Sequence, residues 1–426
     1  DGGQLVAIRA DGIGGGLMRR LLSDPLPLRH TTEWPGYAAD DIIPWAFGRT
    51  RIPARRYADN GKTFVLADHA LAGVDQVYDD GVEIAGWRLR NGADMNGHAV
   101  AFIELAEAPA GALSADVRGL PGTIAAIINT IYPRTDLTDL NIWAAQAGIE
   151  LGGALIEDQT LRSALQLVCD QFGGAWSAGM PGFAAPFPPI DTDPTWRTFD
   201  ALTCADARAD CALDTVQNRL TVRFDWDYAA GRARQSLVVE APASIDWLGV
   251  RSATLDLPWI KTARAAYAVA ERRLQWRARA LWTVQFSASS DARSIPPGGW
   301  IGLSGPDFPV NGRAVVTDID PGYGRGAASI TAQIPSGPVP AVVLVRQSAA
   351  FDPIQTEYQI SADRDTITLT VTDETGQALP GARVWIDDRG PITADAAAQV
   401  RFKATAGRHV LRIESNGKTV TTEIQV

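Results

Sequence analysis

The chain has 426 residues, of which 46% are hydrophobic and 21% charged, and its formal net charge is −10. The length predicts two to four domains, and the composition is that of a globular chain rather than a disordered one. The acidic balance argues against a dedicated nucleic-acid binder. No apolar run approaches the ~20 residues of a membrane helix, and a signal peptide is absent, so we expect synthesis in the cytoplasm.

Residues 1–30 form an N-terminal segment that contains DGIGGG at residues 11–16. Glycines after a strand-like stretch are typical of dinucleotide-binding loops. Here the third glycine of that fingerprint would fall at Leu17. The nearest acid for a ribose, Glu33, lies in a stretch that does not read as a second βα unit. The pattern therefore predicts a glycine turn, and we expect no cofactor.

Residues 31–120 predict a first all-β domain. Short apolar runs are separated by turn-forming glycines about ten residues apart, which favours a barrel or a sandwich. These glycines are Gly48, Gly61, Gly73, Gly81 and Gly86. We expect a β-barrel in this region.

Residues 121–254 predict an insertion domain of helices followed by strands. Three apolar stripes have helical spacing. They consist of Ile124, Ile127, Ile128 and Ile131; of Ile142, Trp143 and Ala147; and of Leu161, Leu165, Val168 and Phe172. Gly173 and Gly174 should end the third helix. The strand candidates are NRLTVRFDWDY, QSLVVEAP and GVRSATLDLPW.

Three cysteines cannot make a disulfide framework. Cys169 lies in the third helical stripe and should pack in a core. Cys204 and Cys211 flank ADARAD, which we expect to be a polar loop. A disulfide there would contribute roughly 2–3 kcal/mol on the loop-entropy model. Two unbridged thiols are the favoured alternative, and the lack of a nearby histidine argues against a metal site.

Asp225 and Asp227 lie within one predicted strand. Residues at i and i+2 of a strand share a face, so the two carboxylates could bind a cation or act as an acid/base pair. Solvated carboxylates are the simpler interpretation, and we favour it.

Residues 255–335 predict one helix that leads into a second β-barrel. Helical spacing relates Ala263, Ala266, Tyr267, Ala270 and Leu274. The period then changes to two, so that Trp282, Val284, Phe286 and Ala288 alternate with polar residues. Gly298-Gly299 and Asn311-Gly312 supply turns.

The same helix gathers four arginines, Arg272, Arg273, Arg277 and Arg279. Together they predict a basic helix face. Two interpretations stay open, namely a subunit interface with acidic neighbours and a solvated face.

Residues 336–365 are rich in Pro, Ser and Ala and predict a linker, and residues 366–426 predict a β-sandwich. Ile367, Leu369 and Val371 alternate with threonines, and Asn416-Gly417 predicts a hairpin. The stretch ETGQALPGARV resembles a turn of bacterial immunoglobulin-like and carboxypeptidase-regulatory-like modules. The resemblance implies an immunoglobulin-like fold and leaves any ligand open.

The four histidines, His30, His69, His98 and His409, lack metal-ligand spacing, so we expect surface or loop positions for them and no bound metal. No Walker phosphate loop is present, and GLSGP at residues 302–306 is not a nucleophile elbow. We find no catalytic residues and expect that the chain is not an enzyme.

Several segments resemble the hub proteins of phage tails. One stretch matches P-x-x-x-G-x-x-R-x-P at Pro44, Gly48, Arg51 and Pro53, and a second matches V-Y-D-x-G at Val77, Tyr78, Asp79 and Gly81. Gly173, Gly174 and Trp176 fit the G-G-x-W/Y that precedes a strand in hubs, and the helix-to-barrel order of residues 255–334 also fits.

This resemblance implies a mainly β protein with some helix (α+β). It would contain two tail-tube-like barrels with intervening helices and a C-terminal immunoglobulin-like sandwich. By the same resemblance, the chain would be a virion structural protein assembled in the host cytoplasm. It would form the homotrimeric baseplate or tail-tip hub. Such a hub joins the hexameric tail tube or distal tail protein to a fibre or tip, lines the channel that ejected DNA passes without specific binding, and contacts the host surface indirectly.

Two alternatives from other classes remain. A carbohydrate-active enzyme or glycan-binding β-module protein would suit the 13 tryptophans, but no pair of carboxylates stands in a recognisable catalytic context. A cell-surface adhesin would need a signal peptide or an anchor, which the sequence lacks.

Overall fold

The structure is a computed structural model, and it divides into two compact units. The first comprises residues 1–233 and 239–343, and the second comprises residues 234–238 and 344–426. The structure describes residues 25–34, 40–57, 60–131, 135–136, 149–177, 182–186, 195–200, 202–295, 298–306, 308, 310–320, 326–349, 355–360, 366–372, 378–387, 389–403, 408–415 and 418–425. The DGIGGG stretch, the stripe around Trp143 and the Asn416-Gly417 turn lie outside the described residues.

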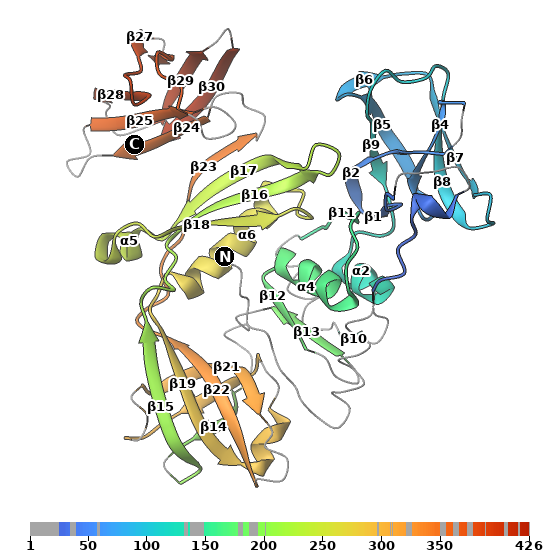
Figure 1. The fold of residues 1–426 in the computed structure, drawn as a ribbon. Coiled ribbons are helices and arrows are strands. Elements are labelled where there is room, and N and C mark those ends of the chain that lie inside the picture. Colours follow the sequence, from blue (N-terminus) through green and yellow to red (C-terminus); the bar gives the residue numbers. More distant parts are fainter. Residues whose placement is uncertain are drawn as a thin grey trace. The chain divides into compact units, whose positions relative to one another are not determined.

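The first unit begins with two open sheets that share one core (Figure 1). One has the order β3-β4-β8-β7, and the other contains β2-β9-β5-β6. Ile52, Leu66, Val77 and Ile103 from these sheets are buried together. The 3-10 helix η1 is Thr31–Glu33, and the strands are β1 Trp45–Phe47, β2 Arg49–Pro53, β3 Arg55–Arg56, β4 Thr63–Ala67, β5 Gly73–Asp79, β6 Val82–Ile84, β7 Trp87–Ala93, β8 Ala99–Leu105 and β9 Leu113–Arg118.

The first barrel that we expected is therefore not closed. Strands β3 and β7 end one sheet, β6 ends the other, and no strand pairing joins the two sheets among the described residues. Closure of a barrel needs that pairing, because every strand must hydrogen-bond on both sides.

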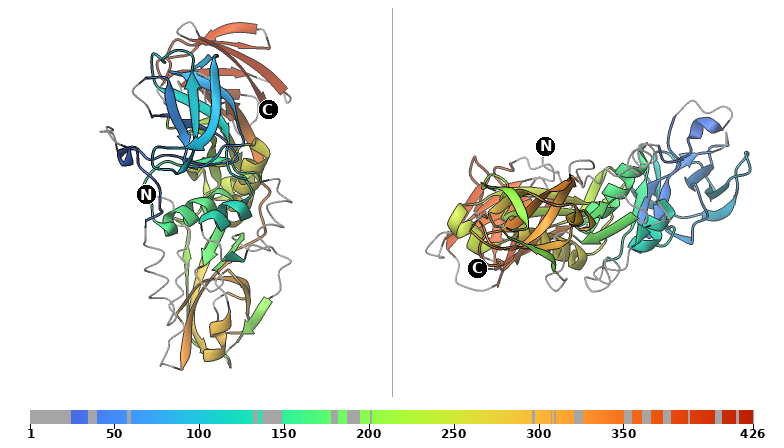
Figure 2. Two further views of the ribbon diagram at one scale, coloured as in Figure 1. Left: turned by 90° about the vertical axis from the view of Figure 1, so that its right-hand side faces the viewer. Right: turned by 90° about the horizontal axis from the view of Figure 1, so that it is seen from below.

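Two predicted helices are confirmed. Helix α2, Ile124–Ile131, buries all four isoleucines of its stripe. Helix α4, Leu161–Gln171, is capped by Thr160, whose hydroxyl accepts a hydrogen bond from the backbone N–H of Ser163. Gly173, with φ of +63°, follows the helix and leads into β12, as the sequence predicted. The two helices contact each other (Figure 2). Short strands accompany them, namely β10 Thr135–Asp136, β11 Gly153–Leu155, β12 Gly174–Ser177 and β13 Gly182–Pro186.

The three strand candidates of residues 218–258 are also confirmed. They are β16 Arg219–Asp227, β17 Arg232–Glu240 and β18 Ser252–Leu257, with α5 Pro242–Leu248 between the last two. Strand β18 pairs in parallel with β16, and β16 also contacts β2. Helix α6, Ala263–Arg277, packs against β16 and buries Ala266, Val269, Ala270 and Leu274.

Helix α6 leads directly into a six-stranded sheet with the order β14-β20-β21-β22-β19-β15 (Figure 1). Val284, Phe286 and Ala288 are buried in its core, which confirms the predicted alternation. The strands are β14 Thr195–Phe199, β15 Cys204–Ala212, β19 Leu281–Ser289, β20 Trp300–Leu303, β21 Gly312–Asp320 and β22 Ala327–Pro335, and the 3-10 helix η2 is Ser290–Ser294.

This second sheet is curled but not closed. Its two edge strands, β14 and β15, are consecutive in the chain and are connected by residues 200–203. The end of β14 and the start of β15 must therefore lie within about 19 Å of each other. No pairing joins them among the described residues. The expected second barrel is thus an open sheet curled around its core.

The second unit contains a β-sandwich. Sheets β24-β25-β28 and β27-β26-β29-β30 pack around Ile367, Leu369, Val371, Val384 and Leu411. The alternation predicted from Ile367 to Val371 is confirmed. The strands are β23 Val343–Ala349, β24 Gln355–Ile360, β25 Thr366–Thr372, β26 Arg383–Ile386, β27 Arg389–Thr393, β28 Gln399–Lys403, β29 Arg408–Ser415 and β30 Lys418–Gln425.

Candidate functional site: an arginine-lined groove beside helix α6

A groove of about 360 Å³ lies between the C-terminal half of α6 and the six-stranded sheet. Arg272 and Trp276 lie one turn apart on α6 and so share one side of it, and Arg279 lies two residues after the helix ends. Trp300 of β20 and Arg313 of β21 line the groove from the sheet. Sequence analysis predicted Arg272 and Arg279 as site residues but missed Arg313, because the strand pairing alone places it there.

Aromatic rings form the base of the groove. Trp276 and Trp300 are 4% and 5% exposed and belong to one buried cluster with Leu281 and Val315. Their ring centroids are 6.3 Å apart in an edge-on arrangement. This packing fixes the groove on two rigid elements, a helix and a strand.

Two of the guanidinium groups are held by the chain itself. Arg279 donates hydrogen bonds to the carbonyl oxygens of Gln275, at 2.9 Å, and Gly337, at 3.1 Å. The guanidinium carbon of Arg313 lies 4.4 Å from the Trp300 ring centroid, which is a cation–π contact. Both side chains are therefore positioned before any ligand arrives.

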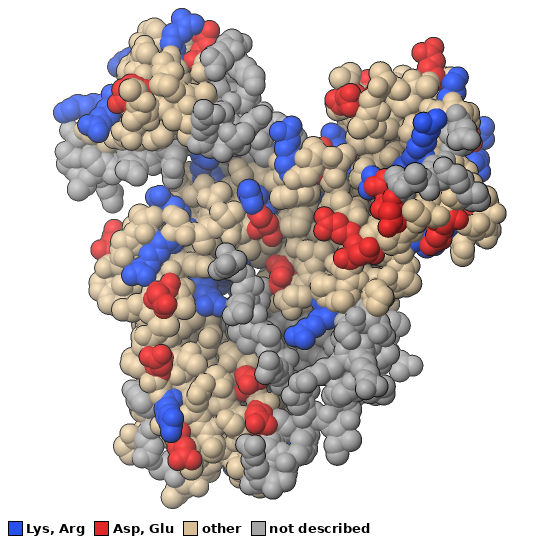
Figure 3. All heavy atoms as spheres, viewed as in Figure 1, with Lys and Arg blue, Asp and Glu red and all other residues tan. Residues whose placement is uncertain are grey.

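The groove is rich in hydrogen-bond donors and poor in acids. Its described lining residues include three arginines, Gln275 and Asn311, and none of them is Asp or Glu. Such a set can hold an anion but cannot supply the paired carboxylates of glycoside hydrolysis. On the face drawn in Figure 3, Lys and Arg side chains are interspersed with Asp and Glu side chains.

The four arginines predicted as one basic face are divided between two environments. Arg272 and Arg279 line the groove, whereas Arg273 and Arg277 do not, and all four side chains are half-buried. Burial lowers the pKa of Arg273 and Arg277, and the charge of Arg277 lowers the pKa of Arg273 further. Arg273 lies 3.3 Å from the side-chain oxygen of Gln217. Only two of the four arginines therefore line the groove, and the subunit-interface interpretation stays a prediction.

The prediction that Asp225 and Asp227 are solvated is wrong. They are 7% and 5% exposed. Asp225 has φ of +57° and lies 2.9 Å from the ammonium of Lys261. Asp227 lies 3.5 Å from Arg51 and accepts two backbone N–H bonds. Each carboxylate contacts its own half-buried cation, so the two do not form an acid/base pair.

Cys204 and Cys211 lie at opposite ends of β15, so ADARAD is the middle of an edge strand rather than a loop. Seven residues of extended chain span about 23 Å, and a disulfide needs Cα atoms within about 7 Å. Neither cysteine is in a disulfide, and Cys169 is buried as predicted.

The histidines are scattered as predicted, but their environments are more varied than a plain surface. His69 lies in a loop, where its Nε2 accepts the backbone N–H of Ala46 at 3.0 Å and burial lowers its pKa. His409 lies on β29, 2.6 Å from Asp387. His30 lies between two carboxylates, at 2.8 Å from Asp40 and 3.2 Å from Asp158. No group of three metal-binding side chains occurs among the described residues.

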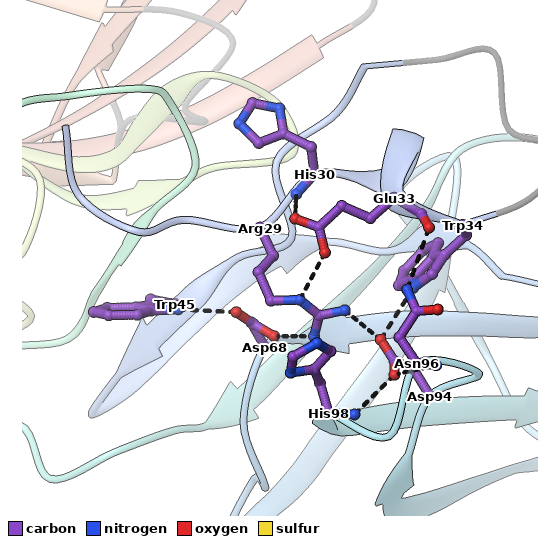
Figure 4. Close-up of polar contacts among 9 residues, drawn as sticks. All are labelled: Arg29, His30, Glu33, Trp34, Trp45, Asp68, Asp94, Asn96 and His98. Atoms are coloured by element: carbon purple, nitrogen blue, oxygen red, sulfur yellow. Dashed lines mark hydrogen bonds and ion pairs between the residues drawn. The ribbon is translucent and has the colours of Figure 1, made fainter.

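A buried ion cluster was missed from the sequence (Figure 4). The guanidinium of Arg29 contacts Glu33 at 3.0 Å, Asp68 at 2.7 Å and Asp94. Burial alone would raise the pKa of Asp94, but hydrogen bonds from Arg29, Trp34 and the backbone lower it to about 2. Burial raises the pKa of Asp68, and Arg29 opposes that rise. The cluster fastens the N-terminal segment to the first β region. Glu33, the former ribose candidate, is one of its acids.

No protein-family model matches the chain, and no curated protein matches it. Several solved structures are similar to the chain. The tail protein from Neisseria meningitidis MC58 has a TM-score of 0.35 and 12% identity over 70% of this chain and 97% of its own. Prophage tail protein gp18 from Listeria monocytogenes EGD-e has a TM-score of 0.29 and 13% identity over 70% and 91%. The 43 kDa tail protein of prophage MuSo2 from Shewanella oneidensis has a TM-score of 0.32 and 12% identity over 70% and 98%.

All three neighbours are described as tail proteins. Their TM-scores are below 0.5, so the likeness is weak. No helix among the described residues is both long enough and apolar enough to span a membrane.

Proposed function

We propose that this chain is a structural protein of a phage tail, and more specifically its baseplate or tail-tip hub. In this role a homotrimer would join the hexameric tail tube or distal tail protein to the fibre or tip and line the channel for DNA. The support comes from the segments that resemble hub proteins and from the place of those residues in the fold.

The observation that carries the proposal is that two separate hub-like stretches meet at one framework contact. Arg51, from the first stretch, lies over the ring of Tyr78, from the second, at 3.7 Å. Arg51 also makes a two-bond contact with Asp116 at 2.9 and 2.7 Å, and the Tyr78 hydroxyl donates to Asp116 at 2.9 Å. These residues hold β2, β5 and β9 together, which is what a structural protein requires of them.

Exposed apolar side chains on the first unit support an assembled state. Trp247 of α5 is 73% exposed and Val250 is 52% exposed. Trp196 of the edge strand β14 is 57% exposed, and Leu202, which follows it, is 94% exposed. Large apolar groups beside open sheet edges are costly in an isolated chain and are expected where neighbouring subunits cover them.

Mass photometry and cryo-electron microscopy of the purified full chain test the proposal. We expect a trimeric ring around a lumen. We also expect the double variant Leu202→Ser, Trp247→Ser to lose the ring while the matched variant Val82→Ser keeps it, although Val82 is 68% exposed on another strand. A chain that stays monomeric at micromolar concentration, or that hydrolyses cell-envelope glycans, would overturn the hub assignment.

A further inference from the structure

We propose that the groove lined by Arg272, Arg279 and Arg313 binds an acidic peptide segment of a partner protein, through its Asp or Glu carboxylates. This goes beyond a structural role in a tail and does not depend on it. It assigns a ligand class to one surface of the first unit.

Charge is the first reason. The groove gathers three guanidinium groups, with no Asp or Glu among its described lining residues, on a chain whose net charge is −10. Arginine keeps its charge at any physiological pH, and its planar fork matches a carboxylate in a two-bond contact. Carboxylates are therefore the groups that this local field favours.

Preorganisation is the second reason. The hydrogen bonds that Arg279 donates to the carbonyl oxygens of Gln275 and Gly337 hold its guanidinium in place. Stacking on Trp300 fixes the plane of Arg313. Side chains that are already ordered lose less rotamer freedom on binding, which favours affinity.

The amides of the groove fit a peptide as well. The Asn311 side-chain oxygen accepts the backbone N–H of Gly305 at 2.9 Å, and its NH₂ group has two N–H donors. Gln275 adds a second carboxamide to the lining. Amide groups of this kind commonly bond the backbone of an extended segment.

Size and apolar lining favour a peptide over a lone inorganic anion. A volume of about 360 Å³ is in the usual range of ligand sites, and one water fills only roughly 30 Å³. Beside the arginines lie Trp276, Trp300, Ile334, Pro335 and Val339. The aliphatic parts of glutamate side chains can pack against these apolar residues, whereas phosphate has no apolar part that could displace water from them.

Fluorescence anisotropy with a labelled hexaglutamate peptide and the full chain tests the inference. The triple variant Arg272→Gln, Arg279→Gln, Arg313→Gln should bind at least tenfold more weakly. The matched triple Arg88→Gln, Arg223→Gln, Arg389→Gln removes the same charge elsewhere and should bind as the wild type does. Circular dichroism checks folding of each variant, and the exposed Arg313→Gln alone serves if the triple variant does not fold.

The other probes decide between ligand classes. Hexalysine should not bind, and inorganic phosphate should not displace the peptide at equal concentration. If both triple variants bound hexaglutamate equally weakly, the result would show only a general charge effect and would overturn the proposed site. Binding of a single-stranded oligonucleotide, but not hexaglutamate, to the same arginines would overturn the peptide class. Failure of hexaglutamate to bind would overturn the inference outright.

Discussion

The Arg29 cluster allows a prediction with a magnitude. The side chains of Asp68 and Asp94 are only 8% and 0% exposed, and Arg29 is the cation that contacts both. Arg29→Met keeps the length of the side chain and removes the charge. Asp94 would retain the Trp34 indole and two backbone N–H donors, whereas Asp68 would retain the Trp45 indole.

Breaking a buried ion pair from one side costs about 3–5 kcal/mol, because it leaves a buried charge without its partner. We expect the lower part of this range, since both carboxylates keep hydrogen bonds. Burial already raises the pKa of Asp68, and loss of Arg29 should raise it further. The folded variant then binds a proton more readily than the unfolded chain does, so its stability deficit should shrink as the pH falls from 7 to 5.

Hydrogen exchange of β4 and β8, read by mass spectrometry, measures the local opening free energy. A loss of about 3 kcal/mol corresponds to roughly 100-fold faster exchange in these strands. The control is Arg90→Met, because Arg90 pairs with Glu104 at 2.7 Å while both side chains stay about 40% exposed, and such a surface pair contributes about 0–1 kcal/mol. The reasoning would be refuted if Arg29→Met lowered the opening free energy by less than about 1 kcal/mol, and by the same amount at pH 7 and pH 5.

Three further outcomes follow from the described residues. Burial lowers the pKa of His30, but Asp40 and Asp158 outweigh it and raise the pKa; the His30→Gln variant should therefore be less stable than wild type at pH 5.5 and equal to it at pH 8.5 in urea titrations. Gly48→Ala would put Cβ 2.1 Å from a backbone oxygen at φ of +57° and should cost at least about 2 kcal/mol, whereas Gly81→Ala, with open space around it, should cost about 1 kcal/mol in the same titrations. A thiol reagent should label two cysteines in the folded chain and Cys169 only after unfolding, because Cys169 is buried and its pKa is raised.

Local periodicity predicted the elements that bury one clear face. Helix α6 and strand β19 follow the spacing of Ala266, Ala270, Val284 and Phe286. Strand β15 was taken for a polar loop because it lies at a sheet edge and fully buries none of its residues. An edge strand needs no apolar run, so its sequence pattern is weak.

The long-range charge contacts could not be predicted from the sequence, for a different reason. Arg29 meets Asp68 and Asp94, which are 39 and 65 residues away. No spacing rule relates residues that distant, and the pairing of β8 with both β4 and β7 brings the relevant strand ends together. The same applies to Arg313, whose place in the groove depends on the register of β21. Sequence therefore predicts the arginines in and just after helix α6 better than those on the facing sheet.

Framework and recognition are built from different residues in this chain. Arg51 is 15% exposed and contacts Asp116, Tyr78 and Asp227, so its loss would weaken three strand contacts together. Arg313 lies at the surface and can change with little effect on folding. Substitutions at the hub-like stretches should thus lower the yield of folded protein. Groove substitutions should leave that yield intact while changing which partner binds, so one framework could serve different partners.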